Sequence, residues 1–307
     1  MADESGTAPG RTDVGAAAVL ERLSGVGHDL TLVGRLTGGE TGAFEVRGHD
    51  GERLVLKWST DPEVFVERAE AVALTERLRT GAGWPVPRQS ILELPGLQVT
   101  LQELLPGEMV TVLTPPLADQ LLALHDRRKG LAWREDRRHF GEELVTTLTV
   151  GGRGYCRHDT LRAFDDRTRR LDDRIVEIGE SAEPDGFPTD DIVHWDLHNE
   201  NVLALDGRVT AIVDSEYALA GDAGFDLVTL ALCTLGSAPG PGSVGAHLWG
   251  SVAEEVDARL VPAYVAHILL RVVDWEIRNH GAAELDLWLA EAERRLPAGS
   301  SGLVELR

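Results

Sequence analysis

The sequence predicts an α+β fold with two lobes, a small sheet-rich lobe followed by a mainly helical one. Between residues 30 and 105, apolar and polar residues alternate as they do in strands, with one helical stretch among them. Beyond residue 106 the apolar residues recur at the helical period of about 3.6 residues. A chain of 307 residues is also too long for one ordinary core. We therefore expect a disordered tail over residues 1–15, a first lobe over 16–105 and a second over 106–307.

The first lobe is expected to contain five strands. The alternating runs are residues 30–36, 44–48, 53–58, 90–94 and 97–102. The dipeptide Asp50-Gly51 between the second and third runs is a strong signal for a two-residue hairpin turn. The register of such a hairpin sets Lys57 opposite Phe44.

Helices are expected in both lobes. In the first, Asp61 can cap a helix that begins at Pro62 and stops at Gly81, since proline suits a first helical position and glycine a terminus. In the second, helical periodicity covers residues 117–127, 140–148 and 159–180. A strand-like segment at 191–216 interrupts these helices.

Composition narrows the classes of partner. The formal net charge of −21 disfavours nucleic acid and anionic membranes and favours a cationic or neutral small molecule. No apolar run is long enough to span a bilayer, and the acidic N-terminus lacks the features of a secretion signal. Two cysteines, Cys156 and Cys233, cannot form a disulfide framework. We therefore expect a cytoplasmic protein without membrane segments.

A second hairpin signal, Asp206-Gly207, lies in the strand-like segment of the second lobe. A two-residue loop there sets Asn201 opposite Ile212. Because side chains alternate between faces, Asp214 would share a face with Asn201. An amide oxygen and a carboxylate that converge in this way can bind Mg²⁺.

Just before this hairpin, Asp196 is placed to act as a general base. The pattern H-x-D-x-x-x-x-N, followed by Asp214, is typical of phosphoryl transfer, in which the carboxylate accepts a proton from the attacking hydroxyl. His194 is expected to be a structural hydrogen-bonding residue that orients this loop. As an alternative, His194, Asp196 and His198 alternate and could bind a transition metal.

The first lobe contains one conspicuous cation. Only two of the 30 basic residues are lysines, and one of them, Lys57, is predicted to lie beside a glycine-rich loop. That loop contains Gly38, Gly39 and Gly42. An ammonium group beside a glycine-rich backbone can hold nucleotide phosphates. We expect Glu70 on the following helix to pair with Lys57, with Glu67 as the rival.

These motifs resemble the aminoglycoside phosphotransferase and choline kinase-like superfamily, from about residue 32 to 230, and we expect the resemblance to extend to the C-terminus. Lys57 and Glu70, with AVALTERL and WPVP, look like its lysine, helix glutamate and following Pro-x-Pro. LQELLPGE looks like its interlobe hinge, and LLALHD looks like its first large-lobe helix. HWDLHNEN, IVDSE and GDAGFDL look like its catalytic loop, metal-binding aspartate segment and next helix start. The resemblance implies a bilobal protein-kinase-like fold, five-stranded in the N-terminal lobe, that uses ATP or GTP with Mg²⁺.

The resemblance also implies roles for single residues. Asp196 would be the base, with Asn201 and Asp214 on Mg²⁺. The backbone at two hinge positions, Glu103 and Leu105, would bind adenine, and Asp226 would tether the catalytic loop. Two positions depart from the family: Trp195 stands where glycine is usual, and Ser215 stands where an aromatic residue is common.

The expected substrate is a hydroxyl of a small cationic antibiotic, an aminoglycoside or a basic peptide or macrolide drug, so that the protein would confer resistance. Four acids could hold the cation, namely Glu200, Glu216, Asp274 and Glu276, by analogy with the family. For Asp274 and Glu276 the simpler interpretation is a helix face turned to water. The alternatives are a metabolic kinase for choline, homoserine or a sugar, and a nucleotide-binding module without activity.

Overall fold

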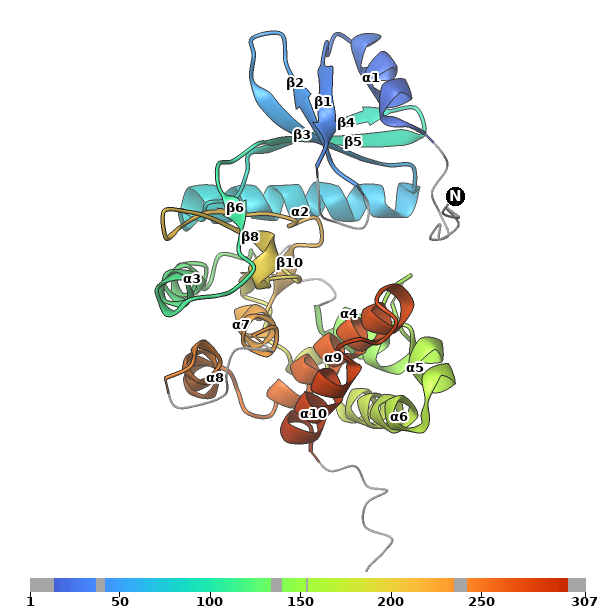
Figure 1. Ribbon diagram of the computed structural model, residues 1–307, viewed down its shortest axis with the longest axis vertical. Helices are drawn as coiled ribbons and strands as arrows, with labels where there is room; N and C mark the ends of the chain where they lie inside the picture. Colours follow the sequence, from blue (N-terminus) through green and yellow to red (C-terminus); the bar gives the residue numbers. More distant parts are fainter. Residues whose placement is uncertain (1–13, 37–41, 134–139, 153, 235–241, 298–307) are drawn as a thin grey trace, which may run out of the picture. The chain divides into compact units, whose positions relative to one another are not determined.

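The computed structural model describes residues 14–36, 42–133, 140–152, 154–234 and 242–297. The chain divides into two compact units (Figure 1). One contains the residues up to Glu108 together with Val202–Ala218, and the other contains Met109–Asn201 and the residues from Leu219 onward. The predicted α+β class is confirmed. The segment 202–218, which we expected in the second lobe, groups with the first unit, and the expected tail at 1–13 lies outside the described residues.

The first unit is built on a five-stranded antiparallel sheet in the order β1-β2-β3-β5-β4. Its strands are β1 (Thr31–Arg35), β2 (Phe44–Arg47), β3 (Arg53–Ser59), β4 (Gln89–Leu94) and β5 (Leu97–Glu103). A smaller sheet has the order β6-β8-β9 and consists of β6 (Glu108–Met109), β8 (Val202–Leu205) and β9 (Arg208–Ile212). The strands expected at 90–94 and 97–102 correspond to β4 and β5 and agree with them to within one residue at each end.

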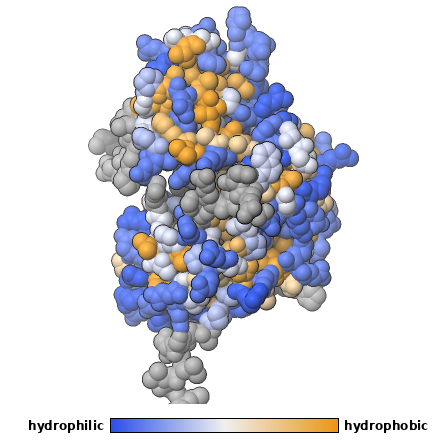
Figure 2. All heavy atoms as spheres, turned by 180° about the vertical axis from the view of Figure 1, so that it is seen from behind, coloured by the Kyte–Doolittle hydropathy of each residue, from blue (hydrophilic) through white to orange (hydrophobic). Residues whose placement is uncertain are grey.

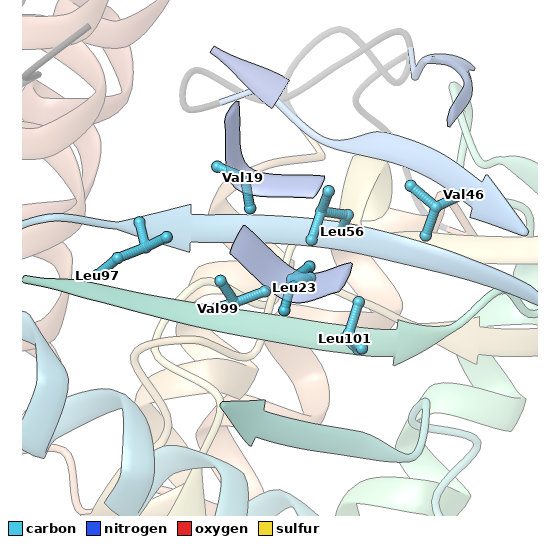
Figure 3. Close-up of a cluster of buried hydrophobic side chains, with 7 residues drawn as sticks. All are labelled: Val19, Leu23, Val46, Leu56, Leu97, Val99 and Leu101. Atoms are coloured by element: carbon cyan, nitrogen blue, oxygen red, sulfur yellow. The ribbon is translucent and has the colours of Figure 1, made fainter. Parts of the chain in front are cut away.

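One face of the five-stranded sheet is apolar and is covered by helix α1 (Ala16–Ser24). Val19 and Leu23 of this helix pack against Leu56 of β3 and Val99 of β5 (Figure 3). The sequence analysis did not identify α1, although its segment AAAVLERLS consists largely of good helix formers. Burial of Val19 and Leu23 gives the short helix the stability that a sequence of nine residues lacks alone.

The opposite face of the sheet is polar and lies toward helix α2 (Pro62–Gly81). Thr100 of β5 pairs with Lys57 of β3, and both side chains are buried. Gln98 Nε2 donates a hydrogen bond of 2.9 Å to the Phe65 carbonyl of α2. The Asp61 side chain caps α2, as predicted, by accepting from the Glu63 amide at 3.0 Å.

The register of the β2–β3 hairpin differs by one residue from the prediction. Phe44 lies opposite Leu56 rather than Lys57. The turn closes with the Gly48 amide donating to the Glu52 carbonyl at 3.0 Å, so the loop has one residue more than Asp50-Gly51 suggested. A slip of one residue exchanges the two faces of a strand. Lys57 therefore lies on the polar face of the sheet, with α2.

The second unit is mainly helical. It contains α3 (Pro115–Arg127), α4 (Phe140–Thr149), α5 (His158–Phe164), α6 (Asp166–Ser181), α7 (Ala223–Leu232), α8 (Val244–Glu255), α9 (Val261–Asn279) and α10 (Leu285–Arg295). Two short strands, β7 (Asp191–Val193) and β10 (Leu219–Gly221), pair antiparallel. None of the described helices is long and apolar enough to cross a membrane. Figure 2 shows mostly hydrophilic residues on the visible face of this unit.

The helical run expected at 159–180 is divided into α5 and α6. Asp165 between them has extended backbone, with φ −152° and ψ 177°, and caps α6 through the amides of Arg167 and Thr168. The Thr168 hydroxyl accepts in return from the Asp165 amide at 3.1 Å. This capping box stops one helix and starts the next without disturbing the helical period of the sequence.

A buried histidine between these helices predicts a pH dependence of stability. His158 Nδ1 lies 2.6 Å from Asp172, which also binds Arg162, and His158 Nε2 lies 3.0 Å from the Thr147 carbonyl. Burial acts to lower the pKa of His158, but Asp172 and Thr147 outweigh burial and raise it above 6.5. The protonated form is thus favoured by folding. Its stabilisation is complete below the unfolded pKa and is lost as pH rises through the folded pKa.

We therefore expect His158→Gln to lower the free energy of unfolding more at about pH 6 than at about pH 9. Urea unfolding of both proteins across this range measures the difference. His247→Gln is the matched control, because His247 is an exposed histidine whose ion pair with Asp119 is at the surface. A His158→Gln effect that grows with pH would contradict the assignment.

Candidate active site

Each unit contains a cluster of charged side chains that includes residues singled out by the sequence. In the first unit, the Lys57 ammonium donates a hydrogen bond to Asp214 and lies 2.7 Å from Glu216 Oε1. Lys57 and Glu216 are each 8% exposed. Burial acts to lower the pKa of Lys57, but Glu216 and Asp214 outweigh it and raise that pKa. Lys57 is therefore a fixed cation on the polar face of the sheet.

Glu216, rather than Glu70, is the buried partner of Lys57. Its second oxygen, Oε2, lies 2.7 Å from an Arg68 guanidinium nitrogen, so one carboxylate binds two cations. Burial acts to raise the pKa of Glu216, but Lys57 and Arg68 outweigh it and lower that pKa. The Glu70 and Glu67 side chains of α2 are both exposed. The predicted pairing of Lys57 with a glutamate of α2 is thus wrong, because α2 presents Arg68 to this face and the segment after Asp214 supplies the carboxylate.

Ser215, between these two acids, belongs to a buried polar network. Its hydroxyl accepts a hydrogen bond of 3.2 Å from Gln89 Nε2 and one of 3.3 Å from the Thr75 hydroxyl of α2. Gln102 Nε2 in turn donates to Gln89 Oε1 at 3.0 Å. The small residue at position 215 suits this interior, because its hydroxyl satisfies polar groups that an aromatic ring would leave unpaired.

The second unit contains Asp196 in the loop after β7. Asn201 Nδ2 donates to the Asp196 carbonyl at 2.8 Å and to its Oδ2 at 3.2 Å. His198 Nε2 lies 3.5 Å from the same oxygen. Arg271 of α9 lies 3.1 Å from the other oxygen, Oδ1. Asn201 of the H-x-D-x-x-x-x-N motif, together with His198 and Arg271, therefore lies at the Asp196 carboxylate.

The charge state of Asp196 follows from these neighbours. Partial burial acts to raise its pKa, but the Arg271 guanidinium and the hydrogen bond from His198 outweigh burial. The pKa of Asp196 is thereby held well below its ordinary value. The group is a carboxylate throughout the physiological range, which is the form that can accept a proton.

Asp226, near the start of α7, holds the loop through its backbone. Its two oxygens accept from the amides of His194 at 2.6 Å and Trp195 at 2.9 Å. Asp226 and its partner Arg128 are both fully buried, and Arg128 also donates to the Ile192 carbonyl at 3.2 Å. A buried ion pair of this kind becomes costly if either partner is removed alone. The sequence analysis did not identify Arg128, and an arginine in a run of basic residues gives no signal of burial.

Trp195 adopts a backbone conformation that favours glycine, with φ at 75°. Its side chain is 4% exposed and stacks on Phe225, with ring centroids 4.8 Å apart. His267 of α9 lies edge-on to the same ring at 4.8 Å. Left-handed backbone costs a non-glycine residue about 1 kcal/mol or more. Packing of the indole offsets this cost, which explains how tryptophan occupies a position where glycine is usual.

This geometry predicts an unusual order of stability for two variants. Trp195→Ala and Trp195→Gly should each lower the free energy of unfolding by about 3 kcal/mol or more, because both remove a buried indole. The glycine variant should nevertheless be the more stable by about 1 kcal/mol, since it relieves the left-handed backbone. Urea unfolding measures both values. An alanine variant more stable than the glycine variant would contradict the strained backbone.

The predicted metal ligands present oxygens of the right kind. The Asn201 contacts described above use its amide nitrogen, so its side-chain oxygen remains for a ligand. Asp214 is bound through Oδ1 to Lys57, and its side chain is 41% exposed. Its φ of 61° is again left-handed, a feature that gathers at functional sites. Carboxylate and amide oxygens are the kinds of ligand that a hard cation such as Mg²⁺ prefers.

The hairpin between these two residues differs in register from the prediction. Val202, rather than Asn201, lies opposite Ile212. The pairing shifts between Leu203 and Ala204, which leaves Thr210 as an extra residue on β9. The Thr210 hydroxyl donates at 2.5 Å to the Pro106 carbonyl, a contact that fixes the bulge. The argument that set Asn201 and Asp214 on one face of a regular hairpin therefore fails at this bulge.

A family model described as the phosphotransferase enzyme family matches residues 33–276 of the chain, well over half of its length. The chain belongs to this family. The phosphotransferase is also 52% identical over 46 residues to streptomycin 6-kinase from Streptomyces griseus, a match that covers only 15% of either chain.

Solved structures similar to the phosphotransferase share its fold. Aminoglycoside phosphotransferase APH(4)-Ia aligns with a TM-score of 0.62 and 17% identity over 92% of this chain and 100% of that one. A thermostable mutant of the same enzyme, in a ternary complex with ADP and hygromycin B, aligns with a TM-score of 0.60 and 16% identity. This alignment covers 88% of this chain and 94% of that one. Amicoumacin kinase hAmiN, in complex with AMP-PNP, Ca²⁺ and Ami, aligns with a TM-score of 0.57 and 16% identity. This alignment covers 87% of this chain and 89% of that one. The predicted protein-kinase-like fold is confirmed.

Three of the four acids expected to hold a cationic substrate are buried and bound by other groups of the chain. Glu216 binds Lys57 and Arg68. Asp274 is fully buried and paired with Arg278 at 2.8 Å. Glu276 is 3% exposed, accepts from the Glu284 amide at 2.8 Å and lies 3.1 Å from His280. The expectation that the two acids of α9 face water is wrong, and of the four only Glu200 has an exposed side chain.

The remaining predicted residues are placed as follows. Gly42 has a left-handed φ of 76°, whereas Gly38 and Gly39 lie outside the described residues. The Glu103 amide donates to the Arg88 carbonyl at 2.9 Å, so only the Glu103 carbonyl is left for an adenine. Leu105 follows the end of β5. Among the described residues no group of three or more His, Cys, Asp or Glu could hold a metal, which removes support from the transition-metal alternative.

Proposed function

We propose that the chain is an ATP- and Mg²⁺-dependent O-phosphotransferase that modifies a hydroxyl of a small antibiotic and thereby confers resistance. The observation that carries the proposal is the Asp196 loop, in which a carboxylate held by Asn201 and Arg271 lies within a chain of the phosphotransferase family. Streptomycin 6-kinase and the complexes with hygromycin B and amicoumacin support an antibiotic as substrate.

The chain's own residues divide the reaction between them. Asp196 accepts a hydrogen bond from the acceptor hydroxyl, orients it and takes its proton as the new O–P bond forms. Lys57, held by Glu216, neutralises the nucleotide phosphates. Asn201 and Asp214 would hold Mg²⁺, which supplies charge stabilisation for the phosphates. The bond from the γ-phosphorus to the bridging oxygen breaks, and ADP departs. Catalysis is mainly positioning and charge stabilisation.

The proposed acceptor is cationic. The net charge of −21 supports this class, because an acidic surface attracts basic drugs. Exposed acids such as Glu200 would bind the cationic acceptor, because Glu216, Asp274 and Glu276 are bound to other groups of the chain. A cytoplasmic location and a reducing environment agree with two free cysteines whose pKa values are raised by burial.

A screen of ATP consumption tests the proposal. Purified protein with Mg²⁺ is incubated with streptomycin, hygromycin B, amicoumacin and a macrolide, and with choline, homoserine and a fructosamine as metabolites. Asp196→Ala is the blank. Turnover with one antibiotic class, with a raised inhibitory concentration in cells that express the protein, is the expected result. Turnover with a metabolite alone would keep the reaction and overturn the resistance role.

A further inference from the structure

Helix α9 contacts the Asp196 loop at two points one helical turn apart. His267 lies edge-on to the Trp195 ring, with centroids 4.8 Å apart. Arg271 donates from one guanidinium nitrogen to the Trp195 carbonyl at 2.8 Å, and the same nitrogen lies 3.1 Å from Asp196 Oδ1. Residues four apart lie on the same face of a helix. The ring, the backbone and the carboxylate of adjoining loop residues are thus all bound by one face of α9.

From these contacts we infer that Arg271 is a positioning residue for phosphoryl transfer, which fixes the carboxylate of Asp196 in the direction that the acceptor hydroxyl requires. This inference rests on the proposed function. Arg271 binds Oδ1, whereas Asn201 and His198 lie at Oδ2. The carboxylate is therefore held at both oxygens, at one by residues of its own loop and at the other by α9.

The backbone of the loop makes such a support necessary. Trp195 has a left-handed φ of 75°, a conformation that the chain leaves unless its surroundings hold it. Asp226 holds the amide side of Trp195 at 2.9 Å, and Arg271 holds its carbonyl. The backbone of Trp195, the residue before Asp196, is thus held at both its amide and its carbonyl. Loss of the contact with either Asp226 or Arg271 would let the loop change conformation and displace the Asp196 carboxylate.

The alternative role for Arg271 is a general contribution to the stability of α9. Arg278 on the same helix supplies the matched control, since it pairs with the fully buried Asp274 at 2.8 Å and makes no described contact with Asp196. Arg271→Met and Arg278→Met each remove a guanidinium that pairs with an acid. Only the first removes an anchor of the loop.

The experiment compares wild type, Arg271→Met, Arg271→Lys and Arg278→Met. We expect Arg271→Met to lower kcat about a hundredfold while the KM for ATP changes less than threefold, because misplacement of a reacting group by about 1 Å has this effect on rate. Arg271→Lys should restore part of kcat. Arg278→Met should lower the stability of the protein but change neither kcat nor the KM for ATP by more than threefold. Equal losses of kcat in both methionine variants would overturn the inference.

Hydrogen exchange on the same proteins separates this inference from the proposed function, because it needs no acceptor. The backbone amides of residues 194–199 should exchange at least tenfold faster in Arg271→Met than in wild type or Arg278→Met. Unchanged exchange there would overturn the role of Arg271 even if wild type phosphorylates an antibiotic. Faster exchange in a protein that modifies no compound would support the anchor and refute the function.

Discussion

Asp196→Asn should lower kcat by a factor of about 1,000 while leaving the fold intact. General acid–base catalysis contributes about 10²- to 10⁴-fold, and asparagine keeps the shape and hydrogen-bonding volume of the side chain but cannot accept a proton. The affinity for the nucleotide should change little, because Asp196 acts on the acceptor. Steady-state kinetics with saturating ATP, together with thermal unfolding of both proteins, measure the effect.

A control for this variant is Asp206→Asn, which changes the same side chain in the turn between β8 and β9. Asp206 is exposed, and its turn lies outside the charged clusters. It should leave kcat within about twofold of wild type, as surface substitutions usually do. If Asp196→Asn kept more than a tenth of wild-type kcat, the role of Asp196 as base would be refuted.

Asp214→Asn should lower turnover by about a hundredfold or more through the nucleotide side of the reaction. A metal ion contributes several kcal/mol of charge stabilisation, and about 1.4 kcal/mol corresponds to a factor of ten. Removal of the carboxylate also leaves Lys57 paired with Glu216 alone. In Asp214→Asn we expect a large rise in the Mg²⁺ concentration needed for half-maximal activity. The affinity of this variant for the antibiotic should equal that of wild type.

Isothermal titration with Mg²⁺-AMP-PNP and with the antibiotic distinguishes the two aspartates. Asp214→Asn should lose nucleotide affinity, whereas Asp196→Asn should retain it. Wild-type Mg²⁺ dependence and kcat in Asp214→Asn would remove Asp214 from the metal site. A loss of folding, seen as a changed circular dichroism spectrum, is not expected, because the side chain is 41% exposed.

Local signals predicted the elements of the fold well. The bounds of α2 follow from Asp61 and Pro62, and β4 and β5 follow from their alternation. The registers of both hairpins were wrong by one residue, since an Asp-Gly dipeptide does not specify whether the loop gains a residue or a strand contains a bulge. The extra residue at Thr210 is fixed by the Pro106 carbonyl, which lies far away in the sequence.

The H-x-D-x-x-x-x-N motif could be found from the sequence because its residues are close together in the chain. The arginines of the two charged clusters were not predicted, because each is defined by a partner from another element: Arg68 by Glu216, Arg128 by Asp226 and Arg271 by Asp196. In a chain with 30 basic residues, sequence alone does not distinguish a buried arginine from an exposed one. Glu216 was likewise not predicted as the partner of Lys57, because it lies far from Lys57 in the sequence.

Mass spectrometry of the product tests the central claim most directly. Streptomycin and hygromycin B are each incubated with Mg²⁺-ATP and either wild type or Asp196→Asn, and the molecular mass of the drug is then measured. The account predicts that wild type adds one phosphoryl group to one of these drugs or to another antibiotic of the screen, and that Asp196→Asn leaves it unmodified. Product formed equally by both proteins, or ATP consumed by wild type with no phosphorylated compound, would contradict it.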